Sequence, residues 1–267
     1  MKTRDLVLMT FLIAAIMLSP AWAEVKSKTV EYRDGDVALQ GYFAWDDAVP
    51  GKRPGIIVVH EWWGLNDYAK KRADMLAQLG YAALAVDMYG KGKVTEHPQQ
   101  AGEWAKQIQA NVADWQKRAL LGLDILKKDP HVDAQRLAAI GYCFGGATVM
   151  EMAYSGADLA GVVSFHGSLP LPTADQMSKI KARILVAQGS EDAFTPPDHV
   201  VEFQNALDKA KADWTMITYG GARHSFTVPD ADKHGMANLR YNKNADERSW
   251  QAMRAFFREL FTAAPAR

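Results

Sequence analysis

The sequence has little cysteine and no excess charge of either sign. Its 267 residues contain one cysteine, Cys143, so no disulfide can form within the chain. A small scaffold held by disulfides is therefore excluded. The 31 Lys and Arg residues balance the 31 Asp and Glu residues, which gives a net charge of zero. This neutrality offers no electrostatic basis for binding nucleic acid or an anionic membrane surface.

The sequence also lacks repeats of fixed period, low-complexity segments and paired metal-ligand motifs. Neither an H-x-x-x-H nor an H-E-x-x-H spacing occurs among its seven histidines, so we expect no zinc site, no other metal and no cofactor. Hydrophobic residues make up 48% of the chain. That content and the length suit one sizeable α/β domain with a full core, or two small ones, and they predict no particular oligomeric state.

The first 23 residues read as a secretory signal peptide, not as part of the fold. Lys2 and Arg4 precede an apolar run from Leu6 to Leu18, and Ala21-Trp22-Ala23 has the form of a cleavage site. The run is short for a spanning helix, so an uncleaved anchor is the weaker alternative. We expect export, to a bacterial periplasm, and a mature single domain over 24–267 with no membrane attachment.

Strands and helices alternate along the rest of the chain. A hairpin is predicted around Asp34-Gly35-Asp36. Short apolar runs then predict buried strands at 55–60, 81–86, 137–140, 159–165, 183–188 and 214–219. Helical patterns cover 67–79, 98–128, 147–154, 196–210 and 246–261. This order predicts an α/β fold with a mainly parallel sheet, flanking helices and functional residues at the carboxyl ends of its strands.

Gly141-Tyr142-Cys143-Phe144-Gly145-Gly146 lies between a predicted strand and a predicted helix. This is the setting of the G-x-S-x-G nucleophile elbow of α/β-hydrolases, with cysteine in place of serine. Glycines at the flanking positions allow strand and helix to approach closely, and the helix N-terminus favours a thiolate. Cys143 is therefore the candidate nucleophile, and a buried inert cysteine is the alternative.

A thiol nucleophile needs a base and an acid that orients the base, which follow in the order acid, then histidine, in α/β-hydrolases. Asp192 follows the fifth buried strand and His224 follows the sixth. We prefer Asp192 to its neighbours Glu191 and Asp198. His60, at a strand end, is expected to be structural, and His166 is a candidate pocket residue.

The oxyanion of an acyl-transfer intermediate needs backbone donors. The expected donors are the N–H of Phe144, which follows the nucleophile, and that of Trp62, in the loop after the first buried strand. Glu61 lies in the same loop, and a solvated loop glutamate is the simplest interpretation from the residues alone.

Three segments together resemble the dienelactone hydrolase family: His60-Glu61-Trp62-Trp63-Gly64-Leu65-Asn66, the elbow, and His224-Ser225-Phe226. The similarity runs from about Val30 to the C-terminal helix. It implies an α/β-hydrolase fold and a Cys143–Asp192–His224 triad, with Glu61 touching the resting thiol and helping to deprotonate it.

The resemblance also implies a carboxymethylenebutenolidase-like activity, in which two arginines hold the substrate carboxylate. In this sequence Lys91 follows the Asp87-Met88-Tyr89 motif, and Thr227 and Val228 follow His-Ser-Phe. Lysine keeps the charge but loses the bidentate fork of arginine. Tyr89, Lys91 and Arg223 are the candidate substrate-binding residues.

The favoured function is hydrolysis of a small carboxylic ester or lactone through a cysteinyl acyl-enzyme. The altered carboxylate clamp leaves open a non-catalytic small-molecule binding protein on the same fold. A thiol peroxidase or redox sensor is a third hypothesis, and the absence of a resolving cysteine argues against it.

Overall fold

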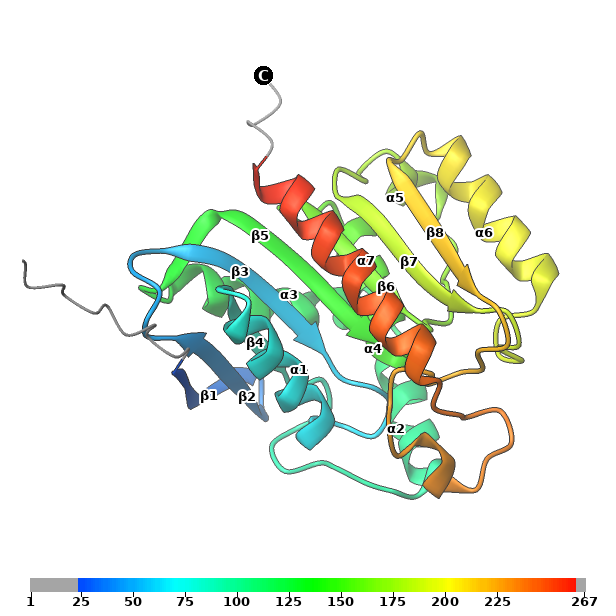
Figure 1. Ribbon diagram of the computed structural model, residues 1–267, viewed down its shortest axis with the longest axis horizontal. Coiled ribbons are helices and arrows are strands. Elements are labelled where there is room, and N and C mark those ends of the chain that lie inside the picture. Colours follow the sequence, from blue (N-terminus) through cyan, green and yellow to red (C-terminus); the bar gives the residue numbers. More distant parts are fainter. Residues whose placement is uncertain (1–23, 263–267) are drawn as a thin grey trace, which may run out of the picture.

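The computed structural model describes residues 24–262 and contains an eight-stranded sheet. The strands lie in the order β1-β2-β4-β3-β5-β6-β7-β8 (Figure 1). β1 and β2 form the predicted antiparallel hairpin, β2 pairs antiparallel with β4, and every later pair is parallel. The strand bounds are β1 Val25–Asp34, β2 Val37–Asp46, β3 Arg53–Val59, β4 Ala82–Val86, β5 Val132–Tyr142, β6 Gly161–Phe165, β7 Arg183–Gly189 and β8 Trp214–Tyr219. The predicted α/β fold is confirmed.

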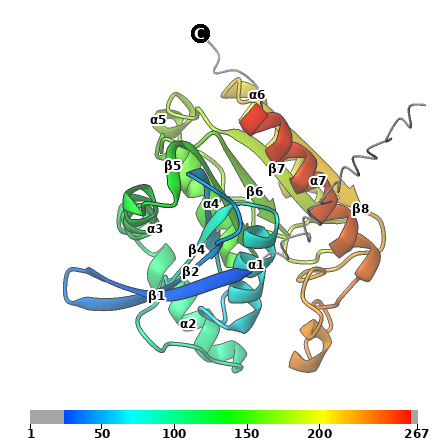
Figure 2. The same cartoon turned by 60° about the vertical axis from the view of Figure 1, so that its left-hand side comes forward.

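Helices cover both faces of the sheet (Figures 1 and 2). The seven helices are α1 Asp67–Gln78, α2 Pro98–Gln109, α3 Val112–Lys128, α4 Phe144–Tyr154, α5 Ala174–Met177, α6 Pro197–Lys209 and α7 Lys243–Thr262, with a 3-10 turn at Ala231–His234. In β3, Ile57 and Val59 face the core under α3, α4 and α6, whereas Ile56 and Val58 face the core under α1 and α7. Both faces of the strand are thus buried, which explains its unbroken run of β-branched residues.

The predicted helix over 98–128 is wrong in one respect, because it is two helices. α2 ends at Gln109, and the side chain of Asn111 accepts hydrogen bonds from the N–H groups of Ala113 and Asp114 at the start of α3. Asparagine is a strong N-cap because its side chain satisfies N–H groups that a new helix leaves free. The helical spacing of apolar residues continues across the break, so this spacing alone does not reveal that one helix ends and another begins.

Among residues 24–262, none of the helices has the length and apolar character needed to cross a bilayer. The proposed signal segment lies outside the described residues.

The strand order brings loops that are distant in sequence to one end of the sheet. β3 lies between β4 and β5, so the loops after Val59, Val86 and Tyr142 are neighbours there. The chain reverses direction of winding at this point, and such switch points are where ligands bind in open α/β sheets. In Figure 1 this is the lower end of the parallel strands, where α2 and the 3-10 turn also lie.

Candidate active site

Cys143 lies at the tip of a sharp turn between β5 and α4. Its backbone has φ 54° and ψ −112°, in a region that residues other than glycine rarely adopt. A Cβ at Gly141 would lie 1.9 Å from the carbonyl oxygen of Gly145, and a Cβ at Gly145 would lie 2.2 Å from that of Val59. Both positions therefore require glycine, and the backbone strain at Cys143 holds its side chain away from the sheet.

His224 and Asp192 are hydrogen-bonded to each other at the carboxyl ends of β8 and β7. Nδ1 of His224 lies 2.8 Å from Oδ2 of Asp192, and both side chains are buried. The carboxylate also accepts hydrogen bonds from the side-chain amide of Gln188, at 2.9 Å, and from the N–H of Phe194, at 3.0 Å. Asp192 is therefore held in place from three sides, and it fixes the Nδ1–H tautomer of the ring.

The imidazole of His224 also interacts with the Cys143 side chain. Burial favours the neutral ring, but the charge of Cys143 and hydrogen bonds to Asp192 and Cys143 outweigh burial and hold the pKa of His224 well above its ordinary value. With Nδ1 engaged by Asp192, Nε2 is the nitrogen left for the thiol. This arrangement can take a proton from sulfur and return it to a leaving group.

The two neighbouring acids are placed differently. Glu191 forms an exposed ion pair with Arg223, with 3.4 Å between the charged groups. Asp198 lies in the first turn of α6, where a carboxylate complements the helix dipole. Of the three acids, only Asp192 is hydrogen-bonded to His224.

The two expected oxyanion donors lie on neighbouring loops. Phe144 is the first residue of α4, where a backbone N–H has no acceptor within its own helix. Trp62 lies in the turn after β3, and a Cβ on Gly102 of α2 would come 3.8 Å from its ring. The rings of His60 and Phe144 stack with 5.9 Å between centroids, so the two loops are packed together.

Glu61 is buried and, within residues 24–262, forms no hydrogen bond with Cys143, although the family resemblance implies that it touches the resting thiol. Its Oε1 accepts a hydrogen bond from the hydroxyl of Ser225 at 2.6 Å, and Oε2 has no hydrogen-bond partner among the described residues. Burial raises the pKa of Glu61, and the Ser225 hydrogen bond and the positive charges of His224 and Arg72 partly oppose that rise. The expectation of a solvated loop glutamate is also wrong, since the residue is 2% exposed.

Behind Glu61 and His224 lies a buried polar network that sequence reasoning missed. Arg72 of α1 donates hydrogen bonds to Tyr68, to the Thr227 carbonyl and to Asp246 of α7. The Thr227 hydroxyl in turn lies 2.6 Å from the Tyr68 hydroxyl and 2.7 Å from Nε2 of His166. No motif signals Arg72, because it reads as an ordinary charge on a helix. The network supplies a buried positive charge close to Glu61.

The two other histidines near the site are structural. His60 is fully buried and accepts the N–H of Met88 at 3.2 Å. The ring of His166 lies edge-on to that of His224 with 5.3 Å between centroids. Burial and the charges of His224 and Arg72 hold the pKa of His166 well below its ordinary value, so this ring stays neutral.

Two of the three candidate substrate-binding residues are engaged at the surface. Nζ of Lys91 lies 2.6 Å from Oε1 of Glu31 in the hairpin, and Arg223 pairs with Glu191 and donates to the Ala237 carbonyl. Tyr89, by contrast, is buried against Phe144. Lys93 is the basic side chain of this loop that lines a cavity, with Nζ 5.9 Å from the ring centroid of Trp104.

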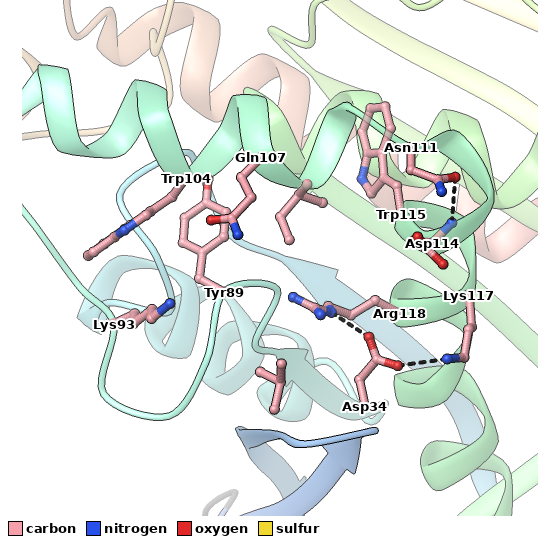
Figure 3. Close-up of a pocket in the computed structure, with 12 residues that line it drawn as sticks. Asp34, Tyr89, Lys93, Trp104, Gln107, Asn111, Asp114, Trp115, Lys117 and Arg118 are labelled. Atoms are coloured by element: carbon pink, nitrogen blue, oxygen red, sulfur yellow. Dashed lines mark hydrogen bonds and ion pairs between the residues drawn. The ribbon is translucent and has the colours of Figure 1, made fainter.

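Two cavities adjoin these residues. One of about 370 Å³ lies between the hairpin, α2 and α3 and is lined by Tyr89, Trp104 and Trp115 (Figure 3). A larger one of about 770 Å³ has Glu61 in its wall, together with Trp63 and the stacked ring of His234. Within 24–262, no group of three or more His, Cys, Asp and Glu side chains is placed to hold a metal ion.

Comparison with known proteins gives a consistent result. The sequence model of the "Dienelactone hydrolase family" matches residues 39–261. A solved dienelactone hydrolase-like promiscuous phosphotriesterase from metagenomic libraries is 40% identical to this chain, with a TM-score of 0.86. The match covers 88% of this chain and 98% of that one.

Two curated relatives are more distant. A putative carboxymethylenebutenolidase from Aquifex aeolicus is 27% identical, over 74% of this chain and 85% of its own length. A probable 2-oxo-3-(5-oxofuran-2-ylidene)propanoate lactonase from Bradyrhizobium is also 27% identical, over 67% of this chain and 75% of its own length. The predicted family resemblance is thus confirmed.

The burial of Glu61 should make the stability of the folded protein depend on pH. Its pKa is raised in the folded protein, so the folded state binds the proton more tightly than the unfolded chain does. The Glu61 carboxyl therefore contributes to the free energy of unfolding at low pH. That contribution is lost as the pH rises through the pKa that Glu61 has in the folded protein. We expect Glu61→Gln to raise the melting temperature at pH 7–8 by about 3 °C, since ~1 kcal/mol corresponds to about 2–4 °C at this size.

Thermal unfolding followed between pH 4 and pH 8 checks this. The gain should shrink toward pH 4, where the wild-type carboxyl is protonated in both states. Glu191→Gln is the matched control, because Glu191 is an exposed loop glutamate and its replacement should change the melting temperature little. A gain for Glu61→Gln that is equal at both ends of the pH range would contradict the explanation.

Proposed function

The chain belongs to the dienelactone hydrolase family, and from this premise we propose that it hydrolyses small carboxylic esters or lactones through a cysteinyl acyl-enzyme. The observation that carries the proposal is the buried hydrogen bond between Asp192 and His224, whose imidazole interacts electrostatically with Cys143 at the strained turn before α4. A strained turn, a buried carboxylate and an imidazole with a raised pKa are typical of catalytic sites, and they favour an enzyme over a non-catalytic binding protein.

The chemistry follows from the geometry. The sulfur of Cys143 attacks the ester carbonyl, and a C–S bond forms as the C=O π bond breaks. His224 holds the thiol proton on Nε2, stabilised by Asp192, and delivers it to the leaving oxygen when the C–O bond breaks. Water then attacks the thioester with His224 as base, which releases the acid and the free thiol. The N–H groups of Trp62 and Phe144 are the proposed donors to each oxyanion.

Glu61 has a supporting role in this scheme. Its unpaired Oε2 is buried beside the site and can accept a proton while Oε1 stays bonded to Ser225. A carboxyl group with a raised pKa is suited to proton exchange near neutral pH. We propose that it helps to deprotonate Cys143 when substrate displaces the side chain toward it, and that the thiol proton then passes to Nε2 of His224, which delivers it to the leaving oxygen.

The substrate class is proposed from the relatives. The Bradyrhizobium relative is a probable lactonase and the Aquifex relative a putative carboxymethylenebutenolidase, which supports lactones with a conjugated acid group. Lys91 and Arg223 are both held by surface carboxylates, which favours substrates whose binding does not depend on these two cations. Phosphotriesters are a second candidate class, because the solved relative at 40% identity is a promiscuous phosphotriesterase.

The first prediction concerns the nucleophile. Cys143→Ala should lower turnover of 4-nitrophenyl acetate and of dienelactone by about 10³-fold or more, because the acyl-enzyme can no longer form. Turnover by the purified mature protein and the melting temperature should be measured together, with a phosphotriester in the same panel. Equal turnover by wild type and the folded variant would refute the assignment. A thioester adduct on Cys143, trapped in acid and seen by mass spectrometry, is the positive result.

The second prediction separates the three candidate acids. Asp192→Asn should lower kcat by about 10²–10⁴-fold, because an amide in that place no longer favours the Nδ1–H tautomer of His224. Glu191→Gln and Asp198→Asn should leave kcat near wild type. Comparable losses in all three variants, or none in Asp192→Asn, would remove Asp192 from the triad.

We also propose that the protein is exported to a bacterial periplasm after cleavage between Ala23 and Glu24, since residues 1–23 have the composition of a signal peptide. The full-length chain, expressed in a Gram-negative host, should yield a periplasmic product whose N-terminal residue is Glu24. Intact-mass analysis of the periplasmic and cytosolic fractions checks this. A full-length product confined to the cytosol would contradict it.

A further inference from the structure

Tyr89 lies at the junction of the loops that build the site. It follows β4 by three residues, and its N–H donates to Oδ1 of Asp87 at 2.9 Å. Its ring lies 4.9 Å from that of His60, edge-on, and 5.4 Å from that of Phe144. The loop after β3 and the start of α4, which carry the two proposed oxyanion donors, are thus the parts of the chain that hold this ring.

The hydroxyl of Tyr89 has no hydrogen-bond partner among the described residues. The side chain is 4% exposed, and its oxygen is shielded from solvent. Leaving a buried hydroxyl unpaired destabilises the folded protein, whereas phenylalanine would pack the same ring without that cost. Such an oxygen is explained if it finds its partner only when a ligand is bound.

Two observations relate Tyr89 to the nucleophile and to a cavity. Cys143 packs against the buried cluster that contains Tyr89 and Phe144, and its charge, after burial, is the second cause that raises the pKa of Tyr89. Tyr89 also lines the cavity of about 370 Å³, as Figure 3 shows, with Trp104 and Gln107 of α2 and Arg118 of α3 around it. Tyr89 thus lies both in the wall of this cavity and against Phe144, the residue that follows Cys143.

We propose that the Tyr89 hydroxyl is a third oxyanion donor, beside the N–H groups of Trp62 and Phe144. When the C–S bond forms and the C=O π bond breaks, the new oxyanion accepts a hydrogen bond from the phenol. When the C–O bond to the leaving group breaks, the carbonyl reforms and that hydrogen bond weakens. The proton stays on the tyrosine throughout, and proton transfer is left to His224 and Glu61.

The electrostatics suit a donor better than an acid. Burial raises the pKa of Tyr89, and the nearby Cys143 raises it further, so the phenol keeps its proton at every pH at which the enzyme works. A preorganised neutral donor in a site without water stabilises charge that develops only in the transition state. The same donor would serve the charged oxygen of a phosphotriester intermediate.

This inference rests on the proposed thiol mechanism, and Tyr89→Phe tests it separately. The variant keeps the ring and its contacts with His60 and Phe144 and removes only the oxygen. We expect kcat for 4-nitrophenyl acetate to fall by about 10²-fold or more, the loss typical of one oxyanion donor, with KM unchanged. The melting temperature should rise, because the variant no longer buries an unpaired hydroxyl. A trifluoromethyl ketone, whose adduct with Cys143 carries an oxyanion, should bind more weakly by a similar factor.

Alkylation of Cys143 by iodoacetamide distinguishes the oxyanion from the thiolate as the partner of Tyr89. This reaction forms no oxyanion, so Tyr89→Phe should leave its rate unchanged. A fall in alkylation rate that matches the fall in kcat would overturn the proposal and assign the phenol to the sulfur. An effect on KM alone, or wild-type kcat and wild-type ketone affinity, would overturn it in favour of a pocket wall.

Tyr142→Phe is the matched control. The Tyr142 hydroxyl is also buried without a partner, and the residue precedes Cys143, but its ring stacks on Phe165 and lies beside Arg72. Its removal should leave kcat and ketone affinity at wild-type values. Equal losses in both tyrosine variants would mean that any buried hydroxyl near the elbow matters, and the specific assignment would fail. If Cys143→Ala kept activity, the thiol mechanism itself would fail, which is a different result.

Discussion

The site depends on how closely the backbone of α4 can approach the ends of β5 and β3. Any side chain at Gly141 or Gly145 would overlap a carbonyl oxygen of the opposing segment. Only this approach allows the chain to turn within one residue, which gives Cys143 its positive φ. The strain at Cys143 is sustained because packing on both sides determines the backbone, and the buried helix α4 leaves no alternative path.

A second constraint is the burial of several ionisable groups at one end of the sheet. Asp192, Glu61, His224 and Arg72 are each less than 5% exposed. Asp192 has three hydrogen-bond donors and Arg72 has a carboxylate, a carbonyl and a hydroxyl, so these charges are satisfied. Glu61 is satisfied on one oxygen only, and burial raises its pKa. The incompletely paired group is the one adjacent to the larger cavity.

The sequence predicts those parts of the molecule whose local residue pattern is compatible with only one local structure. The elbow glycines, the hairpin turn and the buried β-branched runs are of this kind, and the alternation of elements then predicts the sheet. The break at Asn111 is missed because an N-cap inside a continuous apolar stripe leaves the period unchanged. The network around Arg72 is missed because its partners, Thr227 and Asp246, come from distant segments. Lys91 was considered for its place after a motif, but its partner Glu31 lies across the hairpin, a contact that no local pattern encodes.

The unpaired atoms around Cys143 are best understood together. Glu61 Oε2 and the Tyr89 hydroxyl are both buried, and neither has a hydrogen-bond partner within residues 24–262. Glu61 Oε2 is a proton acceptor and the Tyr89 hydroxyl is a hydrogen-bond donor. In the proposed reaction the first serves the thiol, which loses a proton, and the second serves the carbonyl oxygen, which gains negative charge. A resting enzyme that satisfied both groups internally would have to break those bonds before it could bind a transition state. Leaving them unpaired lowers the stability of the free protein but keeps the donors and acceptors in position for charge that appears only during catalysis. On this view two of the unpaired buried polar atoms, Glu61 Oε2 and the Tyr89 hydroxyl, are also proposed catalytic groups, whereas the Tyr142 hydroxyl is not.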